Sequence, residues 1–173
     1  MTVSSSPDVL VTYASKMGAT AGIAAIVTDE LRAHGMAVDV CSVTDVGTVE
    51  DYRIVVVGSA LYARRWRREA VRFLRRHAKP LSGRTVWMFQ SGPCGRDAVH
   101  PDQPEPANVA RLRDAIGADP PITFGGVLDP ATARGFVGRR MARGELAGDF
   151  RDPERIRTWA AGIAMAASPD PTA

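Results

Sequence analysis

The sequence of 173 residues predicts an α/β fold, with five parallel strands and helices on both faces of the sheet. Short apolar runs rich in Val and Ile alternate with longer amphipathic stretches, and loops of small residues follow the first, third and fourth apolar runs. Right-handed crossovers place the sheet between two helical layers, and we expect the strand order 2-1-3-4-5. Ligands of such sheets bind beyond the carboxyl ends of the strands, where these three loops are neighbours.

The first strand, residues 9–11, is followed by a helix over residues 19–34. Ile23, Val27 and Leu31 recur at helical spacing, and Gly35 suits the left-handed position that ends a helix. The connecting loop is rich in small and hydroxyl-bearing residues. Its candidate ligands for an anion are Ser15, Lys16, Met17, Gly18, Ala19 and Thr20. The unpaired N–H groups and the positive dipole end of the helix predict a phosphate site here.

The rest of the chain continues the alternation of strands and helices. Further strands are expected at residues 36–41, 54–58, 85–90 and 122–128. Helices are expected at residues 46–52, from about Trp66 to His77, at 106–116 and from about residue 152 onwards. The length fits one domain over residues 8–167, and residues 1–7 and 168–173 are expected to be disordered tails.

Composition argues against several classes of protein. No apolar run approaches the roughly 18 residues of a membrane span, and no basic and apolar leader precedes the first strand, so we expect a cytoplasmic protein. Cys41 and Cys94 have neither a metal spacing nor a disulfide framework, and the three histidines are scattered, so no metal site is expected. The net charge of +3 is carried mostly by arginine, without an aromatic platform or recognition motif, so no nucleic-acid partner is expected.

The loop from Tyr13 to Thr20 reads YASKMGAT, which matches neither a P-loop nor a dinucleotide-binding pattern. It resembles the phosphate loop of the flavodoxin family, which wraps the phosphate of FMN. It is most similar to the loop of flavodoxin-domain proteins of the menaquinone-dependent protoporphyrinogen oxidase type. Four further segments carry this resemblance: GSALY at 58–62, FLRRHA at 73–78, FGGVL at 124–128 and the basic insertion at 129–149.

The resemblance implies a flavodoxin-like three-layer fold that binds FMN, with the flavin ring flanked by the loops after strands three and four. Besides the phosphate loop, the cofactor-binding residues that it implies are Ser59, Ala60, Leu61, Tyr62, Gln90, Ser91, Gly92, Pro93, Cys94 and Gly95. Tyr62 is a candidate for stacking on the ring. No side chain is assigned a catalytic role because the flavin carries the chemistry, and Cys94 is expected to be an ordinary loop cysteine.

Arginines near the expected ring site suggest an anionic substrate. Arg64 and Arg65 adjoin the ring loop, and Arg139 lies in the insertion. The arginines between residues 67 and 76 fit a solvated helix face equally well. The insertion is basic and amphipathic, which makes it a candidate for contact with a membrane surface or for a homodimer interface.

Three functions are open on these grounds. The first is an FMN-dependent oxidoreductase that takes a hydride equivalent from an organic, anionic substrate and passes electrons to a quinone or another acceptor. The second is a flavodoxin-type electron carrier with a redox protein as partner, although the resemblance implies acidic surfaces for carriers and this rim is basic. The third is a flavin-free binding module, because Ala14 and Ala19 offer no hydroxyl group to a phosphate.

Overall fold

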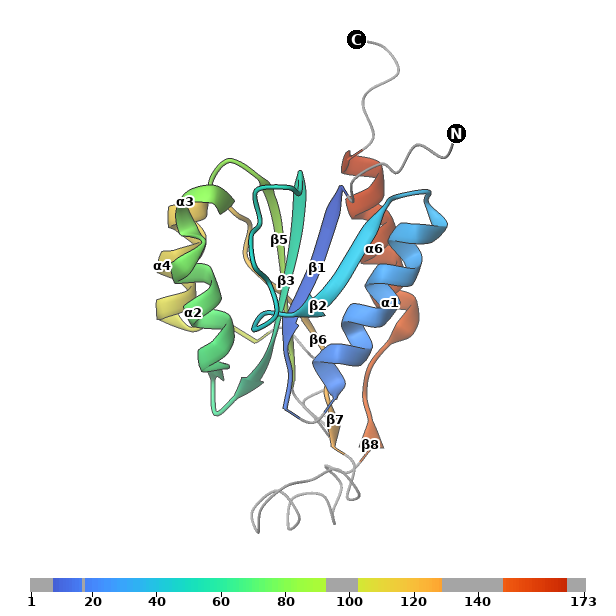
Figure 1. Ribbon diagram of the computed structural model, residues 1–173. Helices are drawn as coiled ribbons and strands as arrows, with labels where there is room; N and C mark the ends of the chain where they lie inside the picture. The colour runs from blue at the N-terminus through green and yellow to red at the C-terminus, as the bar shows by residue number, and fades with distance from the viewer. Residues whose placement is uncertain (1–7, 17, 93–102, 129–147, 168–173) are drawn as a thin grey trace.

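A computed structural model describes residues 8–16, 18–92, 103–128 and 148–167, and in it a central sheet lies between two helical layers (Figure 1). The sheet has six strands in the order β2-β1-β3-β5-β6, with β4 pairing only with β3. Its strands are β1 (Val9–Ala14), β2 (Val38–Ser42), β3 (Ile54–Tyr62), β4 (Arg65–Trp66), β5 (Thr85–Ser91) and β6 (Ile122–Phe124). All pairs except β3–β4 are parallel. The predicted fold class and the order of the five parallel strands are therefore confirmed, and β4 is an addition.

Helices cover both faces of the sheet, as expected (Figure 1). On one face lie α1 (Ala19–Ala33) and α6 (Pro153–Ala167); on the other lie α2 (Arg68–Arg76), α3 (Ala78–Leu81) and α4 (Ala107–Ile116). The expected end of the first helix is confirmed, because Gly35 has a φ of 80° and its N–H donates to the carbonyl of Arg32. None of the helices in the described ranges is long and apolar enough to cross a membrane.

Aromatic rings fill the core beneath α1 and α6. Phe89, Phe124 and Trp159 meet edge to face or tilted, with ring centroids 5.6–6.2 Å apart. Gly58 lies beside Phe89 in the neighbouring strand, and a Cβ at Gly58 would overlap the Phe89 ring. The glycine is therefore required by packing rather than by a turn.

The helix expected at residues 46–52 is absent, and this prediction was wrong. The segment is irregular, with a turn at residues 50–51, and the N–H of Glu50 donates to Thr48 Oγ1 at 3.1 Å instead of to a helical carbonyl. Ser and Thr side chains compete with the helical ladder in this way. The segment is fixed by burial of Val49 and by the Tyr52 hydroxyl, which donates to Asp39 Oδ2 at 2.8 Å.

Residues 59–62 and Trp66 are also placed differently from the prediction. The expected loop is the end of β3, which turns back as a hairpin, so Trp66 lies in β4 and α2 begins only at Arg68. The Trp66 ring N–H donates to Gln90 Oε1 at 2.9 Å, and Ser59 Oγ accepts from the N–H of Arg67 at 3.0 Å. These two bonds hold the hairpin against the sheet, and helical spacing does not show them.

The fifth predicted strand, at residues 122–128, is interrupted. Only β6 joins the main sheet, and after Gly125 and Gly126 the chain pairs as β7 (Val127–Leu128) with β8 (Gly148–Asp149). A Cβ at Gly125 would overlap the carbonyl of Phe150, so glycine is required where the segment after β8 passes close to the chain. The expected tails, at 1–7 and 168–173, and residues 129–147 of the insertion lie outside the described residues.

Candidate functional site

The carboxyl ends of three strands form one row at the lower edge of the sheet in Figure 1. Ala14 pairs with Ser59, Ser59 with Gln90, and Ala60 with Ser91. Hence the loop after β1, the end of β3 and the end of β5 are neighbours, as the strand order predicts. This edge is the place where open α/β sheets bind ligands.

A hydrogen bond between two of its own residues stabilises the loop after β1. Ser15 Oγ accepts from the N–H of Gly18 at 3.1 Å, and Gly18 has a φ of 88° as the residue that precedes α1. A Cβ at Gly18 would meet no atom within 4 Å, so glycine is favoured here by backbone conformation alone. The turn directs the backbone into the helix, and Lys16 is exposed beside it.

The first turn of α1 presents N–H groups to the loop. The first helical bond runs from the N–H of Gly22 to the carbonyl of Gly18, at 2.9 Å, and the amides of Ala19, Thr20 and Ala21 have no intrahelical acceptor. No acidic residue occupies this turn. The helix dipole is therefore not offset by a carboxylate, and an anion is favoured at this end of α1.

Thr20 joins this turn to β5. Its Oγ1 lies 2.7 Å from Ser91 Oγ, and both residues are buried. One hydroxyl donates and the other accepts, so one O–H proton of the pair is left for a further acceptor. The prediction that Thr20 faces a phosphate is not tested by this contact, which shows that the hydroxyl also has a structural partner.

Arg151, which is not among the site residues expected from the sequence, approaches the same helix from the far end of the chain. A Cβ at Gly22 would overlap the Arg151 guanidinium, so this group lies directly on the α1 backbone. Asp149 fixes the guanidinium by accepting from Nε at 2.8 Å and from Nη2 at 2.5 Å. The bonds from Arg151 hold the pKa of Asp149 below its usual range. Only tertiary structure brings this cation near the loop, because about 130 residues separate it from Gly22 along the printed sequence.

The β3–β4 hairpin exposes an aromatic ring and cations at the other end of the row. Ala63 and Arg64 form its two-residue turn with φ angles of 45° and 59°, although neither is glycine. Such left-handed conformations cost about 1–3 kcal/mol each for ordinary residues and are enriched at functional sites. Tyr62 precedes the turn, and 38% of its surface is exposed.

Two predicted cofactor contacts use their side chains inside the protein. Gln90 is fully buried: besides accepting from Trp66, it donates to the carbonyl of Gln103 at 2.8 Å and to Thr123 Oγ1 at 2.9 Å. Ser59 is also fully buried and donates to the carbonyl of Ala60. These residues can therefore contribute to a ligand site through their backbone or by positioning their neighbours.

Gly92 brings the end of β5 close to β3. It has a φ of 143°, its N–H donates to the carbonyl of Phe124 at 3.0 Å, and a Cβ there would lie 3.4 Å from the carbonyl oxygen of Leu61. Leu61 therefore lies against Gly92, the residue that follows β5. The remaining predicted contacts, Met17, Pro93, Cys94, Gly95 and Arg139, lie outside the described residues.

The described residues fit the phosphate of FMN. Free amides at α1, an uncompensated dipole and a left-handed glycine favour a dianion, and the Arg151 guanidinium, which is paired with Asp149, lies against Gly22 in the same helix. Among the described residues, no group of three or more His, Cys, Asp or Glu could hold a metal ion. The free thiol of Cys41 has its pKa raised by burial, with Asp45 and Asp39 adding to the effect, so it is a weak nucleophile.

Comparison with known proteins agrees with this geometry. The family described as flavodoxin domain matches residues 10–117, which is more than half of the chain. A search of curated protein sequences finds no match. Among solved structures, a flavodoxin from the domain Archaea superposes with a TM-score of 0.61 at 14% identity, covering 91% of this chain and 96% of that one.

Two further structures are similar in fold. Flavodoxin 1 from Bacillus cereus gives a TM-score of 0.59 at 13% identity, covering 92% of this chain and 99% of that one. Rubredoxin oxygen:oxidoreductase from Desulfovibrio gigas gives 0.61 at 16% identity, covering 91% of this chain. The present chain spans only 35% of that larger enzyme. At these identities the likeness shows the fold alone.

Proposed function

Because the chain belongs to the flavodoxin domain family, we propose that it binds FMN, the cofactor of that family, at the carboxyl edge of its sheet and transfers electrons there. The observation that carries the proposal is the row formed by the ends of β1, β3 and β5, with the open first turn of α1 beside it. Family membership alone would not say which of this chain's residues hold the cofactor.

The residues of the proposed site divide into one group that is suited to the phosphate and another that is suited to the flavin ring. The amides of Ala19, Thr20 and Ala21, with Ser15 and the Arg151 guanidinium, are suited to the phosphate. Tyr62 offers an exposed ring, and the backbone near Ala60 and Gly92 offers polar contacts. The flavin itself supplies the redox chemistry when it is bound, while the protein orients it and adjusts its potential through charge and hydrogen bonds.

The first test is whether the protein holds FMN. Purified protein is expected to be yellow, or the apoprotein is expected to quench the fluorescence of added FMN with micromolar affinity or better, which corresponds to about 8 kcal/mol. Absence of binding at tens of micromolar FMN would contradict the proposal and favour a flavin-free binding module.

A second candidate is an oxidoreductase of the protoporphyrinogen oxidase type, which removes a hydride equivalent from an anionic organic substrate and passes the electrons to a quinone. It is favoured by Arg64 and Arg65, two exposed cations that adjoin Tyr62 in the hairpin. Anaerobic titration separates the two functions. Direct reduction of the holoprotein by a porphyrinogen, with two electrons for each flavin, would support the oxidoreductase, whereas reduction only by one-electron donors supports the carrier.

A further inference from the structure

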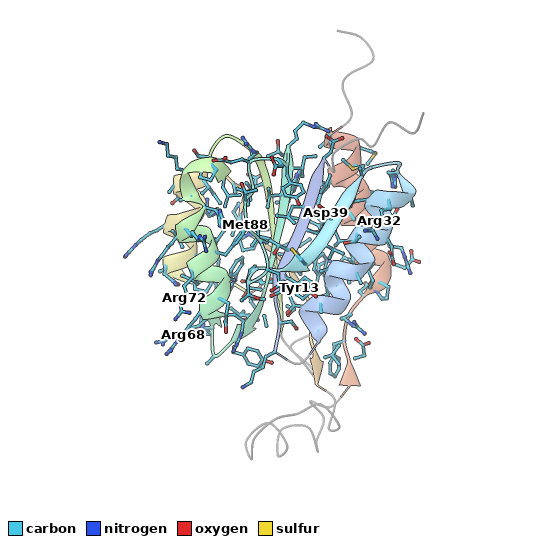
Figure 2. The ribbon with its side chains drawn as sticks, in the orientation of Figure 1. Tyr13, Arg32, Asp39, Arg68, Arg72 and Met88 are labelled. Carbon is cyan, nitrogen blue, oxygen red and sulfur yellow. The ribbon has the colours of Figure 1, made fainter. Side chains whose placement is uncertain are left out.

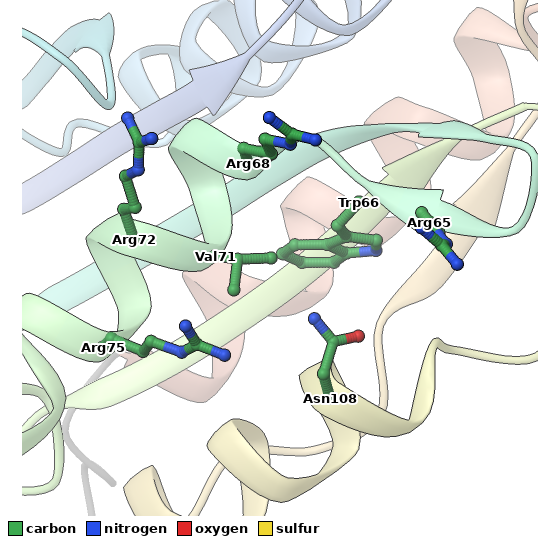
Figure 3. A pocket seen from close by; sticks show the side chains of 7 residues that line it. All are labelled: Arg65, Trp66, Arg68, Val71, Arg72, Arg75 and Asn108. Atoms are coloured by element: carbon green, nitrogen blue, oxygen red, sulfur yellow. The ribbon is translucent and has the colours of Figure 1, made fainter.

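Four arginines line a groove that no part of the proposed cofactor site uses. The groove has a volume of about 510 Å³ and lies between β4, α2 and α4 (Figure 3). Its lining residues are Arg65, Trp66, Arg68, Val71, Arg72, Arg75 and Asn108, and no acidic residue is among them. We call it the arginine groove.

The four guanidinium groups have no partner among the residues that the structure describes. Arg65, Arg68, Arg72 and Arg75 are exposed, and none of their side chains forms an ion pair or hydrogen bond with another residue in the described ranges. Figure 2 shows Arg68 and Arg72 extending from α2 away from the sheet. By contrast, the neighbouring Arg67 is paired with Glu69 at 3.0 Å.

This arrangement is unfavourable for α2 itself. Arg68, Arg72 and Arg75 follow one another at helical spacing, and like charges three or four residues apart destabilise a helix by about 0.2–0.5 kcal/mol per pair. Arg68 is moreover the first residue of the helix, where the dipole disfavours a cation. Arg75 lies in the last turn, where the dipole favours a cation, so the unfavourable terms fall on Arg68 and Arg72. A negatively charged ligand would offset the repulsion among the three arginines.

The groove adjoins the proposed flavin contacts. In the β3–β4 hairpin, Tyr62 pairs with Arg65 and Leu61 with Trp66, so one wall of the groove is bonded to the strand that carries the exposed tyrosine. A protein bound along α2 would therefore lie next to the flavin edge. The three α2 arginines span about 10 Å along the axis, at 1.5 Å per residue, which matches carboxylates on successive turns of a partner helix.

We propose that the arginine groove docks an acidic electron-transfer protein that exchanges electrons with the bound flavin. The inference rests on the proposed function and adds the charge of the partner. A nucleic acid fits less well, because strand binding uses exposed aromatic rings for base stacking. In this groove the one aromatic residue, Trp66, is 4% exposed and its ring N–H is bonded to Gln90.

The test compares two variants that each lose three positive charges. The groove variant is Arg68→Gln/Arg72→Gln/Arg75→Gln. The control variant is Arg76→Gln/Lys79→Gln/Arg157→Gln, whose residues are exposed and do not line the groove. Gln and Arg have similar helix propensities, so both variants should fold, which circular dichroism checks.

The probe is a [2Fe–2S] ferredoxin chosen for net negative charge at pH 7. Stopped flow measures its reduced form reacting with the oxidised holoprotein: one electron leaves the cluster, which is oxidised, and enters the flavin, which is reduced. At low ionic strength we expect the groove variant to react about tenfold more slowly, with a weaker salt dependence, and the control to stay within about twofold of wild type.

Several results would overturn the proposal. One is an equal loss in both variants, which would make net charge the cause; another is no loss in the groove variant. A third is a labelled single-stranded RNA that binds wild type but not the groove variant and displaces the ferredoxin. If wild type holds no FMN, the proposed function fails separately, and calorimetry with oxidised ferredoxin then tests the groove on the apoprotein. Absence of binding to wild type at low salt would overturn the docking.

Discussion

The carboxyl ends of β1, β3 and β5 form a row, and the two ends of this row differ in the groups that they expose. At the α1 end, the groups that face the loop are backbone amides, and Thr20 and Ser91 are buried against each other. At the hairpin end, Tyr62 and the arginines are exposed and the turn is held at positive φ. Under the proposed function, this difference assigns the phosphate to the α1 end and the flavin ring to the hairpin end.

The largest effect is expected from Thr20→Val. It leaves the Ser91 hydroxyl buried without its partner, and such a group costs about 1–3 kcal/mol of unfolding free energy. Urea unfolding of the apoprotein measures the loss. The control is Thr158→Val, which removes an exposed hydroxyl that donates to the carbonyl of Glu154, and it should cost less than about 0.5 kcal/mol. Equal losses in the two variants would show that the buried pair is not special.

A second comparison uses Gly18→Ala and Gly35→Ala. Both glycines have positive φ, and a Cβ at either meets no atom within 4 Å, so each substitution should cost about 1 kcal/mol through the backbone alone. Only Gly18 lies in the loop that we propose binds the phosphate. We therefore expect FMN affinity to fall about tenfold in Gly18→Ala and to stay unchanged in Gly35→Ala, as measured by fluorescence titration.

Tyr62→Leu tests the hairpin end. Because 38% of the residue is exposed, the unfolding free energy should change by less than about 0.5 kcal/mol. Loss of aromatic stacking should weaken FMN binding by about 0.5–1.5 kcal/mol, or about two- to tenfold, while Tyr62→Phe keeps most of the affinity. Unchanged affinity in Tyr62→Leu would remove this residue from the site.

The smallest expected effect is on the pH dependence of stability, to which His77 on the α2 face and Asp149 near α1 contribute in different pH ranges. Burial, with Arg76 nearby, lowers the pKa of His77 below its ordinary value of 6.5. Its neutral form is therefore favoured in the fold, and the stability that it contributes is present above about pH 6.5 and lost as the pH falls through the lowered value. The thermal midpoint of wild-type apoprotein should decrease below pH 6.5, and His77→Phe should flatten that decrease.

The pKa of Asp149, near the α1 end, is also lowered, but there the fold favours the charged form of the side chain. Its lowered pKa means that its contribution is present above the ordinary value of 3.8 and lost as the pH falls through the lower folded value. Arg151→Gln should remove that loss without changing the decrease near pH 6. A decrease near pH 6 that persists in His77→Phe would assign it to another group.

The sequence predicted the layers, the strand order and the loop between β1 and α1, because periodicity and loop composition report which segments are buried. That this loop binds a phosphate stays a prediction. It did not predict the β3–β4 hairpin, since Trp66 is fixed there by a side-chain bond to Gln90 across the sheet. Arg151 was missed for the same reason: the contact with α1 depends on the path of the chain around β8. Local spacing reports which face is apolar, but not which distant polar group completes a site.

The most direct test of the central claim compares FMN with riboflavin, which has the same ring but no phosphate. If the α1 end grips a dianion, FMN should bind at least about 100-fold more tightly, equivalent to about 2.7 kcal/mol. The ratio should shrink in Gly18→Ala and persist in Tyr62→Leu. Equal affinities for the two flavins in the wild-type protein would contradict the phosphate site.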